Sequence, residues 1–463
     1  MVKVSFSGTR PLFLVLLLFI VSACATYYTR NLQFNQAFQQ GRFQEAEKIL
    51  TKDKKADRRK TKLLYFLNRG VVAALDGRYE QSNQYFEEAY RISDSYHRDP
   101  AQLALALLTN PNAEQYNGED FERILLHYYK ALNYLNLGNY ESALVECRRM
   151  DIKLKALEDK YHSKNKYRKD AFIHLLMGLV YDVNHDYNNA FIAYRNAYNI
   201  YKEEYQTLFS ISPPEQLKKD LLRTAYLTGF MDEVRYYEKE FGMKYTHEKK
   251  QGGELVFLWH NGLGPVKAEW SINFTIIKGA GGVFTFVNDE LALNFSFSLP
   301  PDNSNAQGLE KLQFIRVAFP KYVERPPVYR EGKIVLNNET YPLYKVEDIN
   351  QIAFQSLKDR MMLELGTSLL RLALKKASEY ALRQQNQGAG AALSAFNAIT
   401  EKADTRNWQT LPHSIYYARI PVGPGEKKLS VQFSGNDTLT KEMTYNIPSG
   451  QTYFQVFNTF DSY

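Results

Sequence analysis

Histidine is the side chain most often used for acid–base catalysis and for binding transition metals, and it occurs eight times in this 463-residue chain. The eight are His97, His127, His162, His174, His185, His247, His260 and His413. No two have the HExxH spacing with which a zinc protease holds its metal. The glycine run at 279–282 lacks the GK[ST] ending of a phosphate-binding loop, and no GxSxG nucleophile turn is present. The sequence therefore predicts no metal site, no cofactor and no enzymatic activity.

The most suggestive polar group near the C-terminus is Asp404, Arg406 and Trp408. An arginine and an aspartate at this spacing can form a bidentate ion pair beside the indole ring. Such a group either binds a ligand or holds two parts of the chain together as a structural latch. A deep polar pocket with strongly shifted pKa values would favour the ligand site.

The first 23 residues have the layout of a secretory signal peptide. Lys3 and Arg10 precede an apolar run at 12–21, which the small residues Ser22 and Ala23 follow. An apolar run of this length is shorter than the roughly 20 residues needed to cross a bilayer. We therefore predict a cleaved signal peptide at 1–23.

The sequence Val21-Ser22-Ala23-Cys24 resembles the lipobox of bacterial lipoproteins. The resemblance implies that Cys24 is acylated, for example with palmitate, and becomes the first residue of the mature protein, and several acyl chains hold a protein firmly on a membrane. Ala25 follows Cys24 where an aspartate would resemble an inner-membrane retention signal, which implies sorting to the outer membrane. The residues after Cys24 also lack an acidic export tract, which implies the periplasmic side of that membrane. The only other cysteine is Cys147, so no disulfide is expected within one mature chain.

The net charge is modest for the length of the chain. A formal charge of +7 arises from 58 basic and 51 acidic residues. The densest basic stretch, 52–62, could contact anionic lipid headgroups, but a solvated loop between helices is the simpler explanation. We expect no nucleic-acid partner.

Glycine and aromatic residues recur at fixed offsets in the first half of the chain. The turn at Gly77 is preceded by Gly70 and followed by Tyr79, Phe86 and Ala89, a spacing that resembles the tetratricopeptide (TPR) repeat. Equivalent turns fall at 41, 138, 185 and 229, so the intervals between successive turns are 36, 61, 47 and 44 residues. Because a TPR is about 34 residues long, these intervals predict lengthened helices or loops.

From residue 252 onward, alternating and β-branched runs replace the helical pattern, with glycine and proline between them. Helical periodicity returns at 348–386, and strands resume near 413. We predict an α+β multidomain protein in which an α-solenoid of TPR-like helical hairpins precedes an antiparallel β-rich domain with inserted helices. The predicted units are a signal peptide at 1–23, a TPR-like repeat domain at 24–250, a β-rich domain at 251–412 with a helical insertion at about 348–402, and a small β-module at 413–463 packed on the preceding domain.

Aligning the repeats places a mixed aromatic and polar set on the first helix of each hairpin, which lines the concave side of such arrays. The set is Tyr128, Leu132, Asn136, Phe172, Leu175 and Asp182. A groove of this composition suits a peptide or helix from another envelope protein, although each residue taken singly could be packed in the core instead.

Three stretches of the β-rich half resemble a functionally uncharacterised family of TPR-containing bacterial envelope lipoproteins. They are Asn261-Gly262-Leu263-Gly264-Pro265, then Ala403-Asp404-Thr405-Arg406-Asn407-Trp408 with Leu411-Pro412, and Ala418-Arg419 with Gly423 and Gly425. The resemblance implies an interaction scaffold in cell-envelope assembly or regulation, with a possible link to peptidoglycan synthesis. The alternative is a carbohydrate- or peptidoglycan-binding or processing protein with its site in the β-rich domain.

Overall fold

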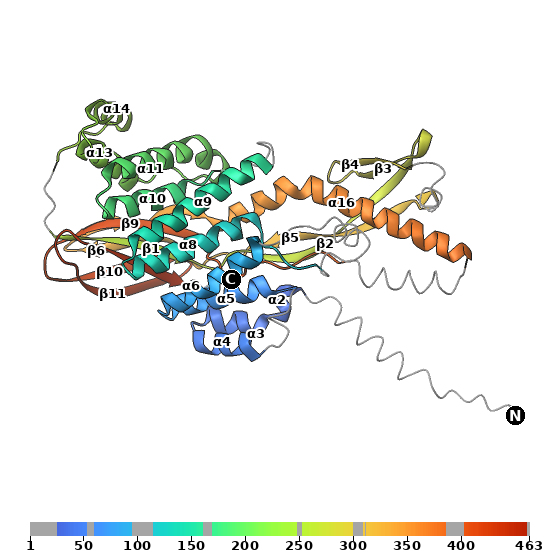
Figure 1. Ribbon diagram of the computed structural model, residues 1–463, viewed down its shortest axis with the longest axis horizontal. Helices are drawn as coiled ribbons and strands as arrows, with labels where there is room; N and C mark the ends of the chain where they lie inside the picture. The colour runs from blue at the N-terminus through green and yellow to red at the C-terminus, as the bar shows by residue number, and fades with distance from the viewer. Residues whose placement is uncertain are drawn as a thin grey trace.

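Helical hairpins stack along one side of a set of strands in this computed structural model, and a long arm projects from one end (Figure 1). The structure describes residues 26–52, 60–94, 114–160, 169–247, 252–299, 309–310, 312–385 and 402–460. The predicted signal peptide and Cys24 lie outside these ranges. The molecule is an α+β protein, as the sequence predicts.

Five antiparallel hairpins make up the helical part of the described chain. They are α3 (Leu32–Gln39) with α4 (Phe43–Lys52), α5 (Lys62–Leu75) with α6 (Tyr79–Asp94), α8 (Asp120–Asn136) with α9 (Tyr140–Lys160), α10 (Ala171–Val183) with α11 (Tyr187–Ile200), and α13 (Glu215–Leu227) with α14 (Met231–Phe241). The short helix α2 (Tyr27–Arg30) precedes them, and a π-helical turn at Tyr201–Tyr205 and α12 (Gln206–Phe209) extend α11.

The turns that close the hairpins are the five predicted from the sequence. Gly41, Gly77, Gly138 and Gly229 have φ values from 70° to 79°, in the left-handed region that glycine adopts without strain. His185 occupies the equivalent place in the fourth hairpin with a φ of 59°, so a residue with a Cβ takes the same conformation there. The predicted positions of the hairpin turns are thus confirmed.

A glycine in two of the repeats allows the two helices of the hairpin to touch. A Cβ atom on Gly178 of α10 would lie 2.3 Å from Tyr194 Cδ1 of α11, and one on Gly70 of α5 would lie 2.6 Å from Phe86 Cε1 of α6. The aromatic ring of the second helix therefore fills the space that the glycine leaves, which is the packing that the spacing predicts.

The described strands form three four-stranded sheets. The central sheet has the order β12-β1-β9-β8, the outer sheet β11-β10-β6-β7, and the arm sheet β4-β3-β2-β5. The strands are β1 (Gly253–Asn261), β2 (Val266–Lys278), β3 (Val283–Asn288), β4 (Leu293–Ser298), β5 (Phe314–Val323), β6 (Tyr329–Leu336), β7 (Glu339–Pro342), β8 (Tyr344–Asp348), β9 (Ser414–Val422), β10 (Glu426–Gly435), β11 (Thr438–Asn446) and β12 (Thr452–Thr459).

The predicted C-terminal module at 413–463 is not a separate unit. Its strands hydrogen-bond into the same sheets as the preceding ones, because β9 lies between β1 and β8 and β10 pairs with β6. The sheets are also not purely antiparallel, since β12 runs parallel to β1 from Glu254↔Thr452 to Asn261↔Thr459. The two segments on either side of residue 413 therefore form one β-structure.

The central sheet is the middle layer of three. Val256, Leu258 and Tyr417 on one of its faces join the core shared with the helices. Leu255 and Trp259 on the other face pack against the outer sheet in a second core. Because both of its faces are covered, the burial pattern of β1 is almost continuous rather than alternating.

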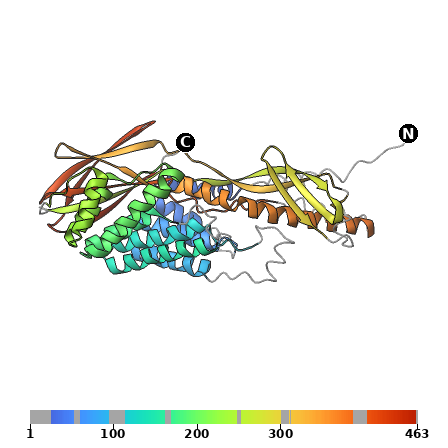
Figure 2. The same ribbon diagram turned by 90° about the horizontal axis from the view of Figure 1, so that it is seen from above.

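The arm consists of the arm sheet and α16 (Ile349–Gln385), which lie side by side (Figures 1 and 2). This helix confirms the predicted helical insertion up to residue 385, and 386–401 lie outside the described residues. At 37 residues it is about 55 Å long. No helix in the described ranges combines the length and the apolar character that crossing a bilayer requires.

Candidate functional site between the helices and the central sheet

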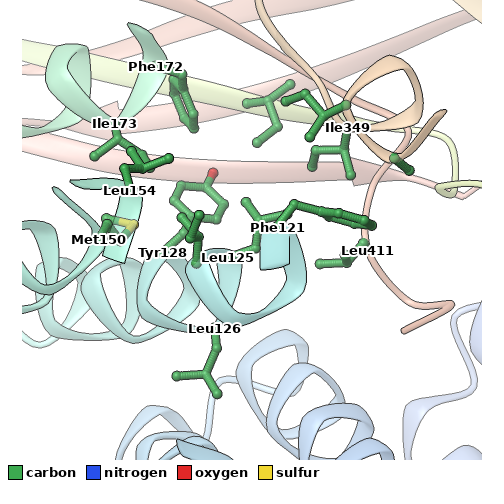
Figure 3. Close-up of a cluster of buried hydrophobic side chains, with 14 of the residues drawn as sticks. Phe121, Leu125, Leu126, Tyr128, Met150, Leu154, Phe172, Ile173, Ile349 and Leu411 are labelled. Atoms are coloured by element: carbon green, nitrogen blue, oxygen red, sulfur yellow. The ribbon is translucent and has the colours of Figure 1, made fainter. Parts of the chain in front are cut away.

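The predicted groove residues lie under the protein's own β-structure. Tyr128, Leu132, Phe172, Leu175 and Asp182 are all buried. Figure 3 shows Tyr128 and Phe172 in a cluster of buried side chains contributed by helices and by later parts of the chain. The prediction that these residues line a groove open to a partner is therefore wrong, because the central sheet covers the concave side of the repeats.

Asn136, the sixth predicted groove residue, is half-buried near the end of α8. Its side-chain amide donates to the Leu132 carbonyl 2.9 Å away, one helical turn earlier. This hydrogen bond satisfies the amide within its own helix. The partial exposure of Asn136 neither supports nor overturns a contact with a partner, so its place in a groove stays a prediction.

Tyr128 connects the helices to the central sheet through His260 of β1. The Tyr128 hydroxyl lies 2.7 Å from His260 Nε2, and His260 Nδ1 lies 3.1 Å from Asn458 Oδ1 of β12. Burial lowers the pKa of His260 to about 4, although the hydrogen bond with Asn458 opposes this shift. The imidazole is consequently neutral near pH 7, so Tyr128 donates to Nε2 and Nδ1 donates to Asn458.

A narrow crevice beside His260 is bordered by Phe38, Tyr129 and Phe460. It has essentially no room for even a water molecule, whereas sites that hold small molecules usually enclose about 300–1,000 Å³. The side chains that border the crevice are largely core residues. It marks the junction of the first hairpins with the central sheet rather than a substrate pocket.

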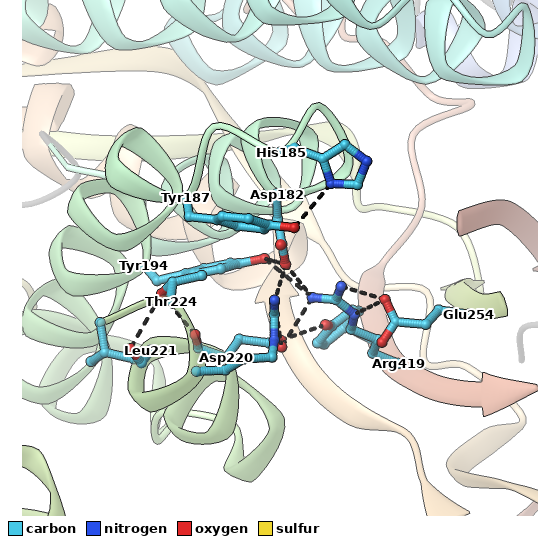
Figure 4. A network of polar contacts seen from close by, with 11 residues as sticks. Asp182, His185, Tyr187, Tyr194, Asp220, Leu221, Thr224, Glu254 and Arg419 are labelled. Atoms are coloured by element: carbon cyan, nitrogen blue, oxygen red, sulfur yellow. Dashed lines mark hydrogen bonds and ion pairs between the residues drawn. The ribbon is translucent and has the colours of Figure 1, made fainter. Parts of the chain in front are cut away.

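Asp182 belongs to a buried network of charges, which Figure 4 shows. Arg419 Nη1 of β9 lies 2.6 Å from Asp182 Oδ2 and 3.0 Å from Asp220 Oδ1 of α13. Arg419 Nη2 lies 2.5 Å from Glu254 Oε2 of β1, and Arg223 of α13 also pairs with Asp182. The network therefore joins the fourth and fifth hairpins to two strands of the central sheet.

The charges in this network stabilise one another. Burial alone would raise the pKa of Asp182, but Arg419 and Arg223 together hold it well below its ordinary value. Burial alone would lower the pKa of Arg419, but Asp220 and Asp182 hold it above its ordinary value. Asp182 and Arg419 therefore remain ionised near pH 7. The described residues contain no group of three possible ligands placed to hold a metal ion.

The stretch 403–412, which we term the latch segment, contains Asp404, Arg406 and Trp408. Arg406 and Asp404 form the predicted bidentate pair, with Nε 2.9 Å from Oδ1 and Nη2 2.7 Å from Oδ2. Arg406 Nη1 also donates to the carbonyl oxygens of Lys60, at 2.6 Å, and Glu114, at 2.9 Å. These hydrogen bonds join the latch segment to the chain between the repeat helices, so the structure favours a structural latch over a ligand site.

Trp408 is buried between helices of the first repeats. Its backbone N–H donates to Glu122 Oε1, 2.6 Å away, and its ring Nε1 donates to Thr410 Oγ1 at 2.8 Å. The indole packs against the rings of Phe86 and Tyr129, with centroids 6.0 and 5.6 Å away. Since Trp408 is only 1% exposed, core side chains enclose the face on which a sugar would stack.

Other residues of the latch segment reach the first two hairpins and the helix before them. Thr405 Oγ1 accepts from the Tyr27 backbone N–H at 3.0 Å, and Gln409 Oε1 accepts from the Asn35 amide at 2.9 Å. Thr410 Oγ1 donates to Asn68 Oδ1 at 3.1 Å. An extended part of the protein's own chain therefore makes the polar contacts that a bound peptide would make in a repeat groove.

Another buried ionic group, which no sequence pattern had indicated, lies at the base of the arm. Glu119 pairs with Lys267 of β2 and with Arg360 of α16. Burial would raise the pKa of Glu119, but Arg360 and Lys267 lower it to about 2. Burial together with the neighbouring Glu119 raises the pKa of Glu122 to about 7.

Glu119 and Glu122 form a capping box at the start of α8, a local pattern that marks a helix N-terminus but does not indicate the distant partners of Glu119. One sequence signal could have revealed that the groove is covered. Helix α10 is apolar almost all round, and such a helix is normally covered on every side, which argues against an open groove beside Phe172.

Cys147 is fully buried on α9, and burial raises its thiol pKa far above the ordinary value. A thiol in this environment is a poor nucleophile because it stays protonated. Cys147 is therefore a core residue.

No protein-family model matches the chain, and no curated protein matches it. Among solved structures, the crystal structure of MamA is 16% identical, with a TM-score of 0.27 over 44% of this chain and 90% of that one. MamA residues 41 to the end from Desulfovibrio magneticus RS-1 are 16% identical, with a TM-score of 0.29 over 46% of this chain and 89% of that one. BtubC from P. vanneervenii is 13% identical, with a TM-score of 0.29 over 48% of this chain and 80% of that one. Scores this low carry no argument about the chain, so the helical hairpins stand on their own geometry.

Proposed function

We propose that this chain is a lipid-anchored scaffold of the bacterial envelope, held on the periplasmic side of the outer membrane through Cys24 and without catalytic activity of its own. The buried position of Tyr27 is the observation that supports this proposal best. Tyr27 is only 8% exposed, and its backbone N–H donates to Thr405. The folded body thus includes a residue only three positions after the cysteine that would carry the lipid.

A tether of three residues spans at most about 11 Å when fully extended. Such a connection holds the folded body against the membrane surface. A scaffold that works at a bilayer benefits from this arrangement, because its surfaces keep a fixed height and orientation.

The contacts between helices and sheets also support a scaffold. The latch segment and the Arg419 network join the repeats to the β-structure at several distant points. A protein built in this way presents its outer surfaces in fixed relation to each other. The concave groove is filled, so partners must bind elsewhere.

The outer side of α9 is one candidate surface. Val145 and Ile152 are seven residues apart on the same face of this helix and are 44% and 63% exposed. Tyr236 of α14 is 58% exposed at the end of the repeats. Tyrosine is enriched at protein interfaces, and the fully buried centre of an interface is more apolar than the rest of the surface. The link with peptidoglycan synthesis depends on the family resemblance and forms part of this proposal.

The anchor is tested by Cys24→Ser. We expect the variant to lose incorporation of labelled palmitate and to move from the membrane fraction to the soluble periplasmic fraction, because its acyl chains are missing. Cys147→Ser is the matched control and should stay with the membrane. A Cys24→Ser protein that still fractionates with membranes would contradict the anchor.

The scaffold role is tested by photo-crosslinking in living cells. A photoreactive residue at Ile152 or Tyr236 should give specific crosslinks to envelope proteins, and identifying them would show whether peptidoglycan synthesis is involved. Tyr128 is the control, since it is buried and should crosslink only within the chain. Absence of products from both exposed positions would contradict binding through these surfaces.

A further inference from the structure

The arm sheet has one face that α16 does not cover. On the covered face, Phe274 and Phe286 are buried, and a Cβ on Gly366 of α16 would lie 3.4 Å from Phe295. Side chains alternate between the two faces of a strand, so the residues between these positions point away from α16. Among them are Ile277 of β2, which is 54% exposed, and Phe314 of β5, which is 67% exposed.

Ile277 and Phe314 are close neighbours on this open face. Phe314 lies opposite Thr275 in the register of β2 and β5, and Ile277 is two residues beyond Thr275 on the same face. Such diagonal neighbours on adjacent strands are about 7–8 Å apart. The two exposed side chains therefore form one apolar patch.

The rest of the open face carries almost no charge. From the Asn273↔Arg316 pair outward to the tip of the arm, its members are Asn273, Thr275, Ile277, Val283, Thr285, Val287, Asn294, Ser296, Ser298, Phe314 and Arg316. Arg316 is the single ionisable side chain in this set, and none of the set is a carboxylate. A surface of this kind can approach an anionic bilayer without electrostatic repulsion.

The open face of the outer sheet provides an internal comparison. It displays Glu331, Lys333, Lys428 and Glu442, and Lys428 Nζ lies 3.3 Å from Glu442 Oε2. This mixture of charges is typical of a sheet face in contact with water. The open face of the outer sheet is therefore rich in charged side chains, whereas the open face of the arm sheet is not. A low density of charge is what allows a surface to lie against a membrane interface instead of water.

The base of the arm is close to the proposed anchor. Helix α2 contacts β2, and it begins three residues after Cys24. Figure 1 shows α2 beside the point where the arm leaves the body. Because the tether spans at most about 11 Å, the bilayer surface must pass close to this point.

We propose that the open face of the arm sheet lies on the membrane surface, with Ile277 and Phe314 entering the interfacial region of the lipid. This inference depends on the proposed lipid anchor and adds the orientation of the anchored protein. The anchor supplies the affinity, and the apolar patch fixes which side of the arm faces the bilayer.

The test uses the full-length lipidated protein in vesicles of phosphatidylethanolamine and phosphatidylglycerol whose acyl chains carry bromine. Ile277→Cys and Phe314→Cys are labelled with an environment-sensitive fluorophore. Cys147 does not compete for the label, because it is fully buried. Tyr236→Cys is the control, since Tyr236 is similarly exposed but lies on α14, at the far end of the molecule from the tip of the arm (Figure 1).

We expect fluorescence at 277 and 314 to be quenched at least about twofold more than at 236, because quenching requires contact with the acyl chains. Equal quenching at all three positions, in protein that floats with the vesicles through Cys24, would overturn the orientation and leave the anchor intact. Protein without lipid on Cys24 would instead overturn the proposed function.

Discussion

Buried charges between the helices and the sheets are compensated by partners far away in the sequence. Arg419 of β9 compensates Asp182 of α10, 237 residues earlier, and Lys267 of β2 compensates Glu119, 148 residues earlier. Breaking a buried ion pair by removing one partner is costly, because the remaining charge is left without compensation. Replacing a single residue in one of these ion-pair groups should therefore destabilise the contact between the helices and the sheets.

Arg419→Met should lower the free energy of unfolding by about 3–5 kcal/mol, since it leaves Asp182, Asp220 and Glu254 with one fewer cation. Denaturant unfolding followed by circular dichroism measures this loss. Arg235→Met is the control, because Arg235 is 67% exposed and its pair with Asp232 should contribute less than about 1 kcal/mol. Equal losses in the two variants would contradict the role given to Arg419.

Glu122→Gln should remove part of the pH dependence of stability. In the folded protein, burial and Glu119 raise the pKa of Glu122 from 4.5 to about 7. Folding therefore favours the protonated form. The stabilisation is complete below pH 4.5 and is lost as the pH rises through 7, by up to about 3 kcal/mol.

The midpoint of denaturant unfolding, measured from pH 5 to pH 8, should fall more steeply for the wild-type protein than for Glu122→Gln. Glu88→Gln is the control, because Glu88 is 41% exposed and should leave the slope unchanged. Parallel curves for the wild type and Glu122→Gln would show that Glu122 does not titrate in this range.

The polar contacts of the latch segment were only partly predictable. The pairing of Asp404 with Arg406 follows from their spacing of two residues, and the structure contains it. The remaining partners of Arg406 and Trp408, such as Glu114 and Glu122, are 292 and 286 residues away. A local pattern does not specify contacts over such distances, so the sequence left the latch and the ligand site as alternatives.

At the scale of secondary structure, the hairpins depend on how closely their two helices approach. Gly178 and Gly366 are both helical glycines, and alanine normally stabilises a helix by about 1 kcal/mol relative to glycine. Their surroundings differ, because a Cβ on Gly178 would meet Tyr194 at 2.3 Å, whereas one on Gly366 would make ordinary contact with Phe295 at 3.4 Å.

Gly178→Ala should therefore lower the thermal midpoint by the equivalent of about 1–3 kcal/mol, because Tyr194 must move. Gly366→Ala should leave it unchanged or raise it. Differential scanning calorimetry of the two variants measures both effects. A stabilising Gly178→Ala would mean that the helices of this hairpin are further apart than described.

The hairpins were predictable because glycine and aromatic residues recur locally, and even the turn at His185 occurs at the expected place. The change to strands near residue 252 and again near 413 was predictable from local alternating and β-branched runs. The order of the strands was not, since the pairing of β12 with β1 joins residues such as His260 and Asn458 that are 198 positions apart. The filling of the groove was not predictable either, because local spacing identifies a concave face but not the distant segment that covers it.

At the scale of the whole molecule, the two ends of the described chain meet. The ring of Phe460, just after β12, lies 5.2 Å from that of Phe38 and 5.8 Å from that of Phe43. The first hairpin therefore packs against the last described residue. Its stability should depend on the C-terminal strand more than on its own short helices.

Phe460→Ala should make backbone amides in 32–52 exchange with deuterium roughly thirtyfold faster, since losing the ring removes about 2 kcal/mol of packing from the first hairpin. Hydrogen–deuterium exchange with mass spectrometry locates the effect. Tyr453→Ala is the control, because Tyr453 is 47% exposed and its loss should leave 32–52 unchanged. Unchanged exchange in both variants would show that the first hairpin is stable without this contact.

The parallel pairing of β1 with β12 has a consequence for the time course of biosynthesis. Residues paired across these strands, such as His260 and Asn458, are separated by 198 positions. Because an exported chain reaches the periplasm from its N-terminus onward, β1 arrives there about 200 residues before the strand that pairs with it. During that interval an apolar strand edge is unpaired, so this protein should depend on a chaperone until β12 emerges.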